Sequence, residues 1–134
     1  MNWDYITGFF DADGSITLST YHKGANKTVQ ISFHNNELNI LHEIRSFIEK
    51  ETGIKGVITT KQPAKEVHQI AYDLKYVYFR TANRVLEHIH SIHPKKQHRI
   101  KISFELEKTT PRNGKYSVSQ AEQKVLLEKL FFEH

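Results

Sequence analysis

Hydrophobic positions change their spacing several times along the chain, and each change marks a predicted element. Residues 2–13 have helical spacing, with Asn2 as candidate N-cap and Gly14 as the stop after the last turn. In residues 15–21 isoleucine and leucine alternate with polar side chains, which predicts a half-buried strand.

A second strand is predicted after a turn around residues 23–26. Here Val29, Ile31 and Phe33 face one way and their polar neighbours face the other. The two strands therefore form a hairpin with one apolar and one polar face. Helical spacing returns over residues 36–51 and ends before a glycine.

A second pair of strands is predicted after this helix. Residues 57–61 and 67–80 read as strands around a turn at 62–64, and the second is long enough to break near Asp73. Three helices complete the chain.

Each of these helices has its own start signal. Thr81 is the candidate cap of the first, which extends to Ile92, and Pro94 suits the first turn of the second. The capping box formed by Ser119 and Glu122 opens the last, which carries Val125, Leu126, Leu127 and Leu130. The order α-ββ-α-ββ-ααα predicts an α+β fold with antiparallel hairpins, not a doubly wound sheet.

Composition narrows the class of protein. The 134 residues suit one domain, residues 1–134, and 38% hydrophobic with 25% charged residues is ordinary for a globular protein. No apolar run approaches the roughly 20 residues of a membrane span, and the first residues lack a secretory pattern, so we expect an intracellular protein without a membrane partner. The absence of cysteine excludes disulfides, thiolate zinc sites and a cysteine nucleophile. A net charge of +4 leans towards a polyanionic partner without identifying one.

The most informative residues lie at the end of the first predicted helix. Asp11 and Asp13 stand where the helix dipole disfavours negative charge, so a divalent cation such as Mg²⁺ is a natural ligand. Gly8 and Ala12 are four residues apart and leave a groove that a second helix can approach closely.

Other interpretations of Asp-x-Asp-Gly are available. It is often an ordinary turn. An EF-hand loop needs glycine at position 6 and glutamate at position 12, whereas counting from Asp11 puts Gly14 at position 4 and His22 at position 12. A haloacid-dehalogenase-type phosphatase requires a doubly wound sheet and a distal acidic pair, which this pattern does not provide.

Residues 6–14, Ile-Thr-Gly-Phe-Phe-Asp-Ala-Asp-Gly, resemble the nine-residue signature of LAGLIDADG homing endonucleases. Ile6 and Thr7 stand for its Leu and Ala, and Phe9 and Phe10 stand for its Leu-Ile pair. The last four residues are identical. The predicted order of elements also resembles the αββαββα core of that family, whose small members with one signature act as homodimers.

The resemblance implies how the signature works. Helices of two subunits pack through Gly8 and Ala12, which brings their final aspartates together over the scissile phosphates. By position Asp13 matches the metal-binding acid and the Ala12 carbonyl is an additional ligand, while Asp11 matches an acid used in capping and turn structure. The implied cofactor is Mg²⁺, with Mn²⁺ as a substitute and no small-molecule cofactor.

Glu37 resembles the polar residue with which the family organises water, and Asn36 is the next choice. In the alternative interpretation Asn35 or Asn36 caps the following helix and Glu37 favours its first turn. An arginine that some members carry one turn later is missing, because Leu41 occupies that region.

Lys96, with Lys95 as second choice, aligns with a lysine that stabilises charge near the phosphate in this family. The alternative is a solvated cation at a helix end.

The predicted sheet offers a DNA-reading surface. Outward-facing polar side chains suit base edges, since an antiparallel ribbon fits the major groove; they are Ser15, Thr17, Ser19, Tyr21, Thr28, Gln30, Ser32 and His34. Basic residues predicted at turns or strand flanks suit phosphates; they are Lys23, Lys27, Lys55, Lys61, Lys65, Lys75 and Arg80. Any half-exposed sheet also carries such residues. The histidines form no zinc pattern, and His34 alone is retained as a candidate base contact.

Together these features predict a homodimeric, Mg²⁺-dependent endonuclease that cuts both strands of a long, pseudo-palindromic DNA site. The alternative is a relative that no longer cleaves, either a DNA-binding regulator or an intron-splicing RNA maturase.

Overall fold

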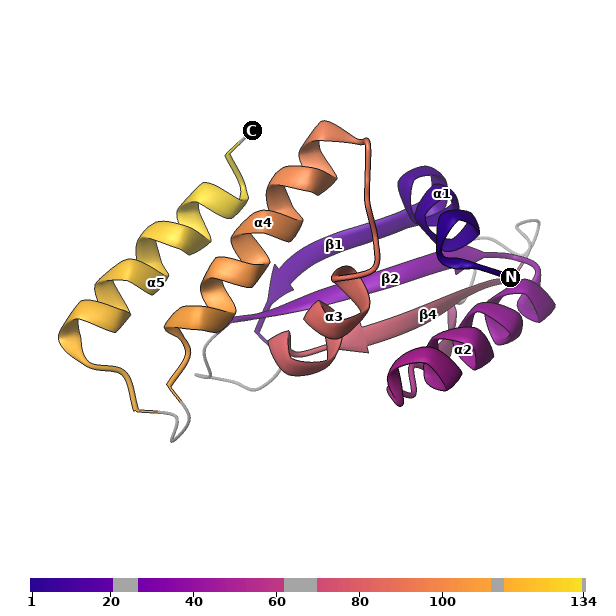
Figure 1. Ribbon diagram of the computed structural model, residues 1–134, viewed down its shortest axis with the longest axis horizontal. Helices are drawn as coiled ribbons and strands as arrows, with labels where there is room; N and C mark the ends of the chain where they lie inside the picture. Colours follow the sequence, from indigo (N-terminus) through magenta and orange to yellow (C-terminus); the bar gives the residue numbers. More distant parts are fainter. Residues whose placement is uncertain (21–26, 62–69, 112–114, 134) are drawn as a thin grey trace.

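The predicted order of elements is confirmed. The computed structural model describes residues 1–20, 27–61, 70–111 and 115–133. Its elements are, in order, α1 Trp3–Asp13, β1 Gly14–Ser19, β2 Thr28–Asn35, α2 Leu38–Thr52, β3 Val57–Lys61, β4 Ala71–Val77, α3 Phe79–Leu86, α4 Pro94–Thr109 and α5 Val118–Phe131. The fold is α+β, with helices gathered against one sheet (Figure 1).

The four strands form one antiparallel sheet in the order β1-β2-β4-β3. The register places Ser15 opposite Ser32 and Gly14 opposite Phe33, and His34 opposite Asp73. Because side chains alternate along a strand, these pairs divide the sheet into a core face and an open face. Helix α3 is drawn in front of β2 and β4, on the core face (Figure 1).

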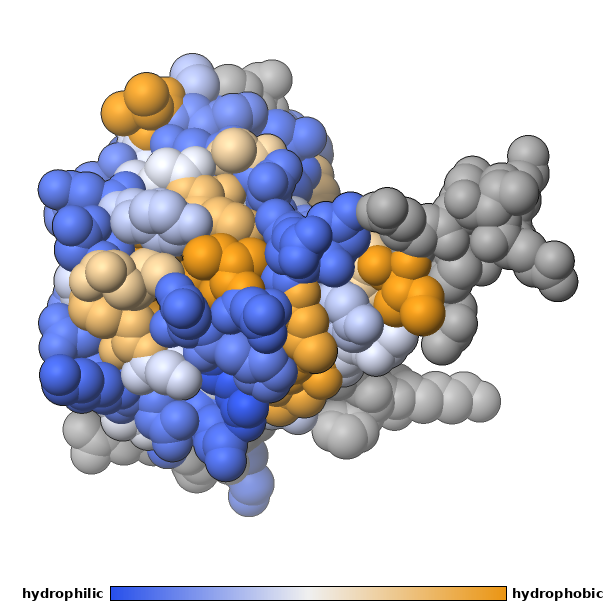
Figure 2. Space-filling view, turned by 90° about the vertical axis from the view of Figure 1, so that its right-hand side faces the viewer, coloured by the Kyte–Doolittle hydropathy of each residue, from blue (hydrophilic) through white to orange (hydrophobic). Residues whose placement is uncertain are grey.

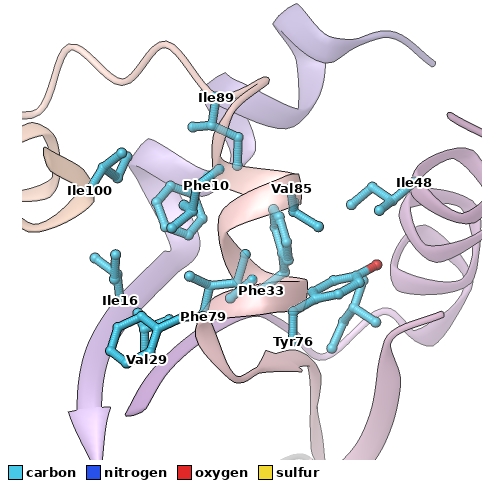
Figure 3. Packing of buried hydrophobic residues seen from close by; sticks show 14 of the residues in the cluster. Phe10, Ile16, Val29, Phe33, Ile48, Tyr76, Phe79, Val85, Ile89 and Ile100 are labelled. Atoms are coloured by element: carbon cyan, nitrogen blue, oxygen red, sulfur yellow. The ribbon is translucent and has the colours of Figure 1, made fainter. Parts of the chain in front are cut away.

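The core lies between this sheet and the helices. Val29, Ile31 and Phe33 are fully buried, as the alternation along β2 predicts. Phe33 contacts the rings of Phe10 and Tyr76, with centroids 5.5 and 6.4 Å apart. Figure 3 shows these rings among aliphatic side chains from helices and strands. Residues distant in sequence thus hold α1 on the sheet.

The start of α1 and the end of α2 follow their sequence signals. The Asn2 side chain accepts a hydrogen bond from the Tyr5 amide at 2.8 Å, which caps α1. Gly53 ends α2 with φ of 75°, a left-handed conformation that glycine adopts without steric cost.

The second half of the chain requires several corrections. The helix expected to extend to Ile92 ends at Leu86 as α3, and Ile92 lies outside it. The strand expected to reach Arg80 ends at Val77, because Tyr78 has φ of 73° and turns the chain into α3. The part of that strand before Ile70 lies outside the described residues. Thr81 does not cap α3, since its hydroxyl donates backwards to the carbonyl of Val77.

The last helix begins two residues earlier than expected. Ser117 and Gln120 form the capping box, in place of Ser119 and Glu122. The buried positions of α5 are then Lys124, Leu127 and Phe131, whereas Val125 and Leu126 are 67% and 57% exposed. Either serine fits the local capping rule, and in the structure Ser117 is the N-cap.

No helix in the described part of the chain is long and apolar enough to cross a membrane.

Candidate metal site and nucleic-acid interface

The end of α1 exposes one carboxylate. Asp13 is the last helical residue and is exposed to solvent, while the amide of Gly14 closes the helix by donating to the carbonyl of Phe10. A carboxylate at this end of a helix faces the negative pole of its dipole. Asp13 is therefore available to a cation.

Lys96 reaches the same helix end from α4. Its Nζ donates to the carbonyl oxygens of Phe10 and Asp11 at 2.8 and 2.9 Å, so the ammonium stabilises the end of α1. Burial lowers the pKa of Lys96, and the nearby Asp11 and Asp13 carboxylates oppose that change. Lys95 is exposed. Lys96 is thus the lysine that lies beside the signature.

Asp11 differs from Asp13 in its partners. Its carboxylate accepts hydrogen bonds from the Ser91 hydroxyl and from the Ile92 amide, the latter at 2.9 Å. These bonds tie the end of α1 to the segment before α4, and Gln97 holds that segment through the Ser91 carbonyl at 2.6 Å. Asp11 has the structural use that its position in the signature implies. Ser91 carries no sequence signal, because nothing local relates it to Asp11.

Glu37 lies at the N-cap position of α2 without making a side-chain cap bond. Its amide donates to the side chain of Asn35 at 2.8 Å, so Asn35 supplies the local turn. Gly14 follows Asp13 and pairs with Phe33, so β2 finishes at the same end of the sheet as that at which α1 ends in Asp13. Glu37 is exposed at that end of the sheet.

The open face carries the predicted polar residues. Ser15, Thr17, Ser19, Thr28, Gln30 and His34 are partly exposed. Ser32 faces the same way but is only 3% exposed, and its hydroxyl lies 3.0 Å from that of Ser15. Tyr21 lies outside the described residues.

A chain of hydrogen bonds crosses this face. Ser15 Oγ lies 3.1 Å from Nε2 of His34, and Nδ1 of His34 contacts the carboxylate of Asp73. Asp73 was not among the predicted site residues. An aspartate at a polar-facing position of the strand was the available signal, but its partner is 39 residues away.

The basic residues are more scattered. Lys27, Lys55 and Lys61 are exposed at the ends of strands or in the loop before β3, and Lys75 is half-buried on β4. Arg80, expected at a strand flank, is exposed in the first turn of α3, three residues after the end of β4. Lys23 and Lys65 lie outside the described residues.

One face of α1 is open for a helix partner. Gly8 and Ala12 are exposed, and a Cβ added at Gly8 would meet no atom within 4 Å. Tyr5, one turn earlier, is 46% exposed. The side of the molecule seen in Figure 2, which includes the region of α1 and α2, shows apolar surface between hydrophilic side chains.

These donors suit a hard, open metal site rather than an enclosed one. Within the described ranges, no three His, Cys, Asp or Glu residues cluster as ligands. Mg²⁺ is typically held by one or two carboxylates together with waters and phosphates, which Asp13 and the backbone beside it can satisfy.

Comparisons with known proteins agree with this geometry. The family model described as LAGLIDADG endonuclease matches residues 6–103. An archaeal intron-encoded homing endonuclease complexed with DNA superposes with a TM-score of 0.67 at 19% identity, covering 98% of this chain and 83% of that one. The homing endonuclease I-CvuI, in complex with a DNA target in the presence of Mg, gives 0.66 at 18% identity, with 98% and 82% covered. No curated protein sequence matches the chain.

Proposed function

The chain belongs to the LAGLIDADG endonuclease family, and we propose that it is an active member that cuts both strands of a long, pseudo-palindromic DNA site. It does so as a homodimer with Mg²⁺, which Mn²⁺ can replace. The observation that carries this proposal is the presence of an exposed carboxylate, Asp13, and of the ammonium of Lys96 at the same helix end. Structural neighbours complexed with DNA, one in the presence of Mg and one of Ca, support the same substrate and metal class.

In the proposed mechanism each side chain has a separate task. Asp13 and the carbonyl of Ala12 hold the metal, which supplies Lewis acidity and activates water when bound. Lys96 stabilises the charge that develops on the phosphate, and Glu37 orients water at the same end of the sheet. The lysines around the sheet bind phosphates and the open face reads bases.

The homodimer follows from the exposed face of α1. One chain supplies one Asp13, whereas cutting two strands needs two such sites related by symmetry. Packing two copies of α1 through Gly8 and Ala12 makes a two-fold contact with the same surface on both subunits. Such a dimer matches a DNA site with two related halves.

The proposal is tested with a plasmid library of randomised targets. Purified protein is incubated with Mg²⁺, Mn²⁺, Ca²⁺ or EDTA, and the cut ends are sequenced. We expect double-strand cuts with short 3′ overhangs in Mg²⁺ and Mn²⁺, and binding without efficient cutting in Ca²⁺, whose looser geometry positions water poorly. Specific binding without cutting under every metal condition would contradict the proposal and favour a regulator, or a maturase if the preferred ligand is structured RNA.

A further inference from the structure

Three side chains from three strands form a directed hydrogen-bond chain on the open face. Ser15 of β1 bonds Nε2 of His34 on β2 at 3.1 Å, and Nδ1 of His34 contacts Asp73 on β4. The register explains the meeting, because His34 pairs with Asp73 and Ser15 with the neighbouring Ser32.

Asp73 fixes the direction of this chain. An ionised carboxylate only accepts hydrogen bonds, so Nδ1 of His34 must carry the proton that is donated to it. In the neutral imidazole the other nitrogen is then an acceptor. The hydroxyl of Ser15 donates to it, and the hydroxyl of Ser32 donates to Ser15 at 3.0 Å.

In this contact His34 is the more exposed partner and Asp73 the more buried one. The side chain of His34 is 39% exposed and that of Asp73 is 11% exposed. A solvent-exposed carboxylate on this face would repel DNA phosphates. The carboxylate of Asp73 is instead largely buried, and it orients the imidazole ring of His34. The imidazole of His34 is thus partly exposed, and its Nε2 carries the lone pair to which Ser15 donates.

We propose that Asp73 is a positioning residue that presents His34 as a hydrogen-bond acceptor, so that His34 selects adenine or cytosine on the DNA strand that it contacts. In the major groove these bases offer an amino group, adenine N6 or cytosine N4, whereas guanine and thymine offer acceptors. The serine hydroxyl holds the acceptor position in the free protein and gives way to the base. This inference rests on the proposed function.

The test combines binding profiles with a spectroscopic signature. Binding is measured at about pH 8 against targets in which each base pair is varied in turn. We expect one base pair per half-site to prefer adenine or cytosine by about threefold to tenfold, the range of one neutral hydrogen bond. His34→Ala abolishes this preference. Asp73→Asn reduces it, because an amide can donate to Nδ1 as well as accept from it.

Nitrogen-15 NMR of labelled histidine gives the second readout. The native His34 should show a proton on Nδ1 and none on Nε2, and Asp73→Asn should lose this fixed tautomer. His42→Ala is the matched control, since His42 is exposed on α2, away from the open face of the sheet, and should leave both the tautomer and that base pair unchanged.

The possible failures are distinguishable. A preference for guanine or thymine at the base pair that responds to His34→Ala, a proton on Nε2, or no responding base pair at all would overturn the role of Asp73 while leaving the endonuclease proposal intact. Absence of sequence-specific duplex binding by the native protein would overturn the proposed function and this inference with it.

Discussion

The two faces of the sheet are made by the same strands and hold their side chains in opposite ways. On the core face Val29, Ile31 and Phe33 are fully buried against helices. On the open face Ser15, His34 and Asp73 bond to one another instead of to a covering layer. Burial of apolar area supplies most of the stability of a fold, so one face holds the protein together and the other is available for recognition.

The end of α1 repeats this contrast over two residues. Asp11 is bonded to Ser91 and Ile92 and serves the fold, whereas Asp13 is exposed. Activity and stability should therefore respond to different substitutions.

The largest expected effect concerns Asp13. Asp13→Asn keeps the size of the side chain and removes its charge, so the variant should fold, dimerise and bind its target. Cleavage in Mg²⁺ should fall at least about a hundredfold, because metal stabilisation of the transition state is worth several kcal/mol. Timed cleavage of a labelled target measures this, with melting temperature as the folding control. Native cutting rates in the variant would remove Asp13 from the site.

The core face should show the largest effect on stability. Phe33→Ala removes a fully buried ring and should lower the free energy of unfolding by about 3–5 kcal/mol. Thr17→Ala, on the open face, should change it by no more than about 0.5 kcal/mol. Urea unfolding of both variants compares the faces directly, and similar losses would show that both faces carry stability.

The exposed face of α1 should matter for association alone. Gly8→Leu introduces a better helix former at a position with open space in the single chain. In the dimer it should force the helices apart and weaken association by about 1–3 kcal/mol, roughly tenfold to a hundredfold. Sedimentation at several concentrations tests this, and an unchanged dimer would place the interface elsewhere.

Asp11 should behave unlike its neighbour. Asp11→Ala leaves the Ser91 hydroxyl and the Ile92 amide without their carboxylate partner, which should cost about 1–3 kcal/mol of folding stability. Thermal unfolding of Asp11→Ala beside Asp13→Asn separates the two roles. Equal stability of both variants would mean that the contrast between the two carboxylates does not hold.

The smallest effect is on the salt dependence of DNA binding. Lys27→Ala or Lys61→Ala should flatten the slope of log K against log salt by about one unit for each phosphate contact removed. Lys108, which lies on α4 and pairs with Glu105 at 3.3 Å, provides the control. Equal slopes for all three variants would exclude Lys27 and Lys61 as phosphate contacts.

Local sequence determined the elements and the division of the sheet into faces. The alternation of residues 28–34 predicted which side chains of β2 are buried, and Asn2 and Gly53 predicted ends of α1 and α2. The signature at residues 6–14 was sufficient to indicate the family and to place Asp13 at the end of a helix. These features depend on residues a few positions apart, where periodicity and capping act.

Tertiary structure decided which side chains meet. Lys96 reaches the Phe10 carbonyl across 86 positions, and His34 reaches Asp73 across 39. The starts of α3 and α5 also differ from the local prediction, since Tyr78 turns the chain before α3 and Ser117 rather than Ser119 caps α5. Strand register and helix packing create these contacts between residues far apart in the sequence, and no local sequence pattern predicts such pairs. The sequence therefore located the candidate acid, and only the folded structure supplied its neighbours.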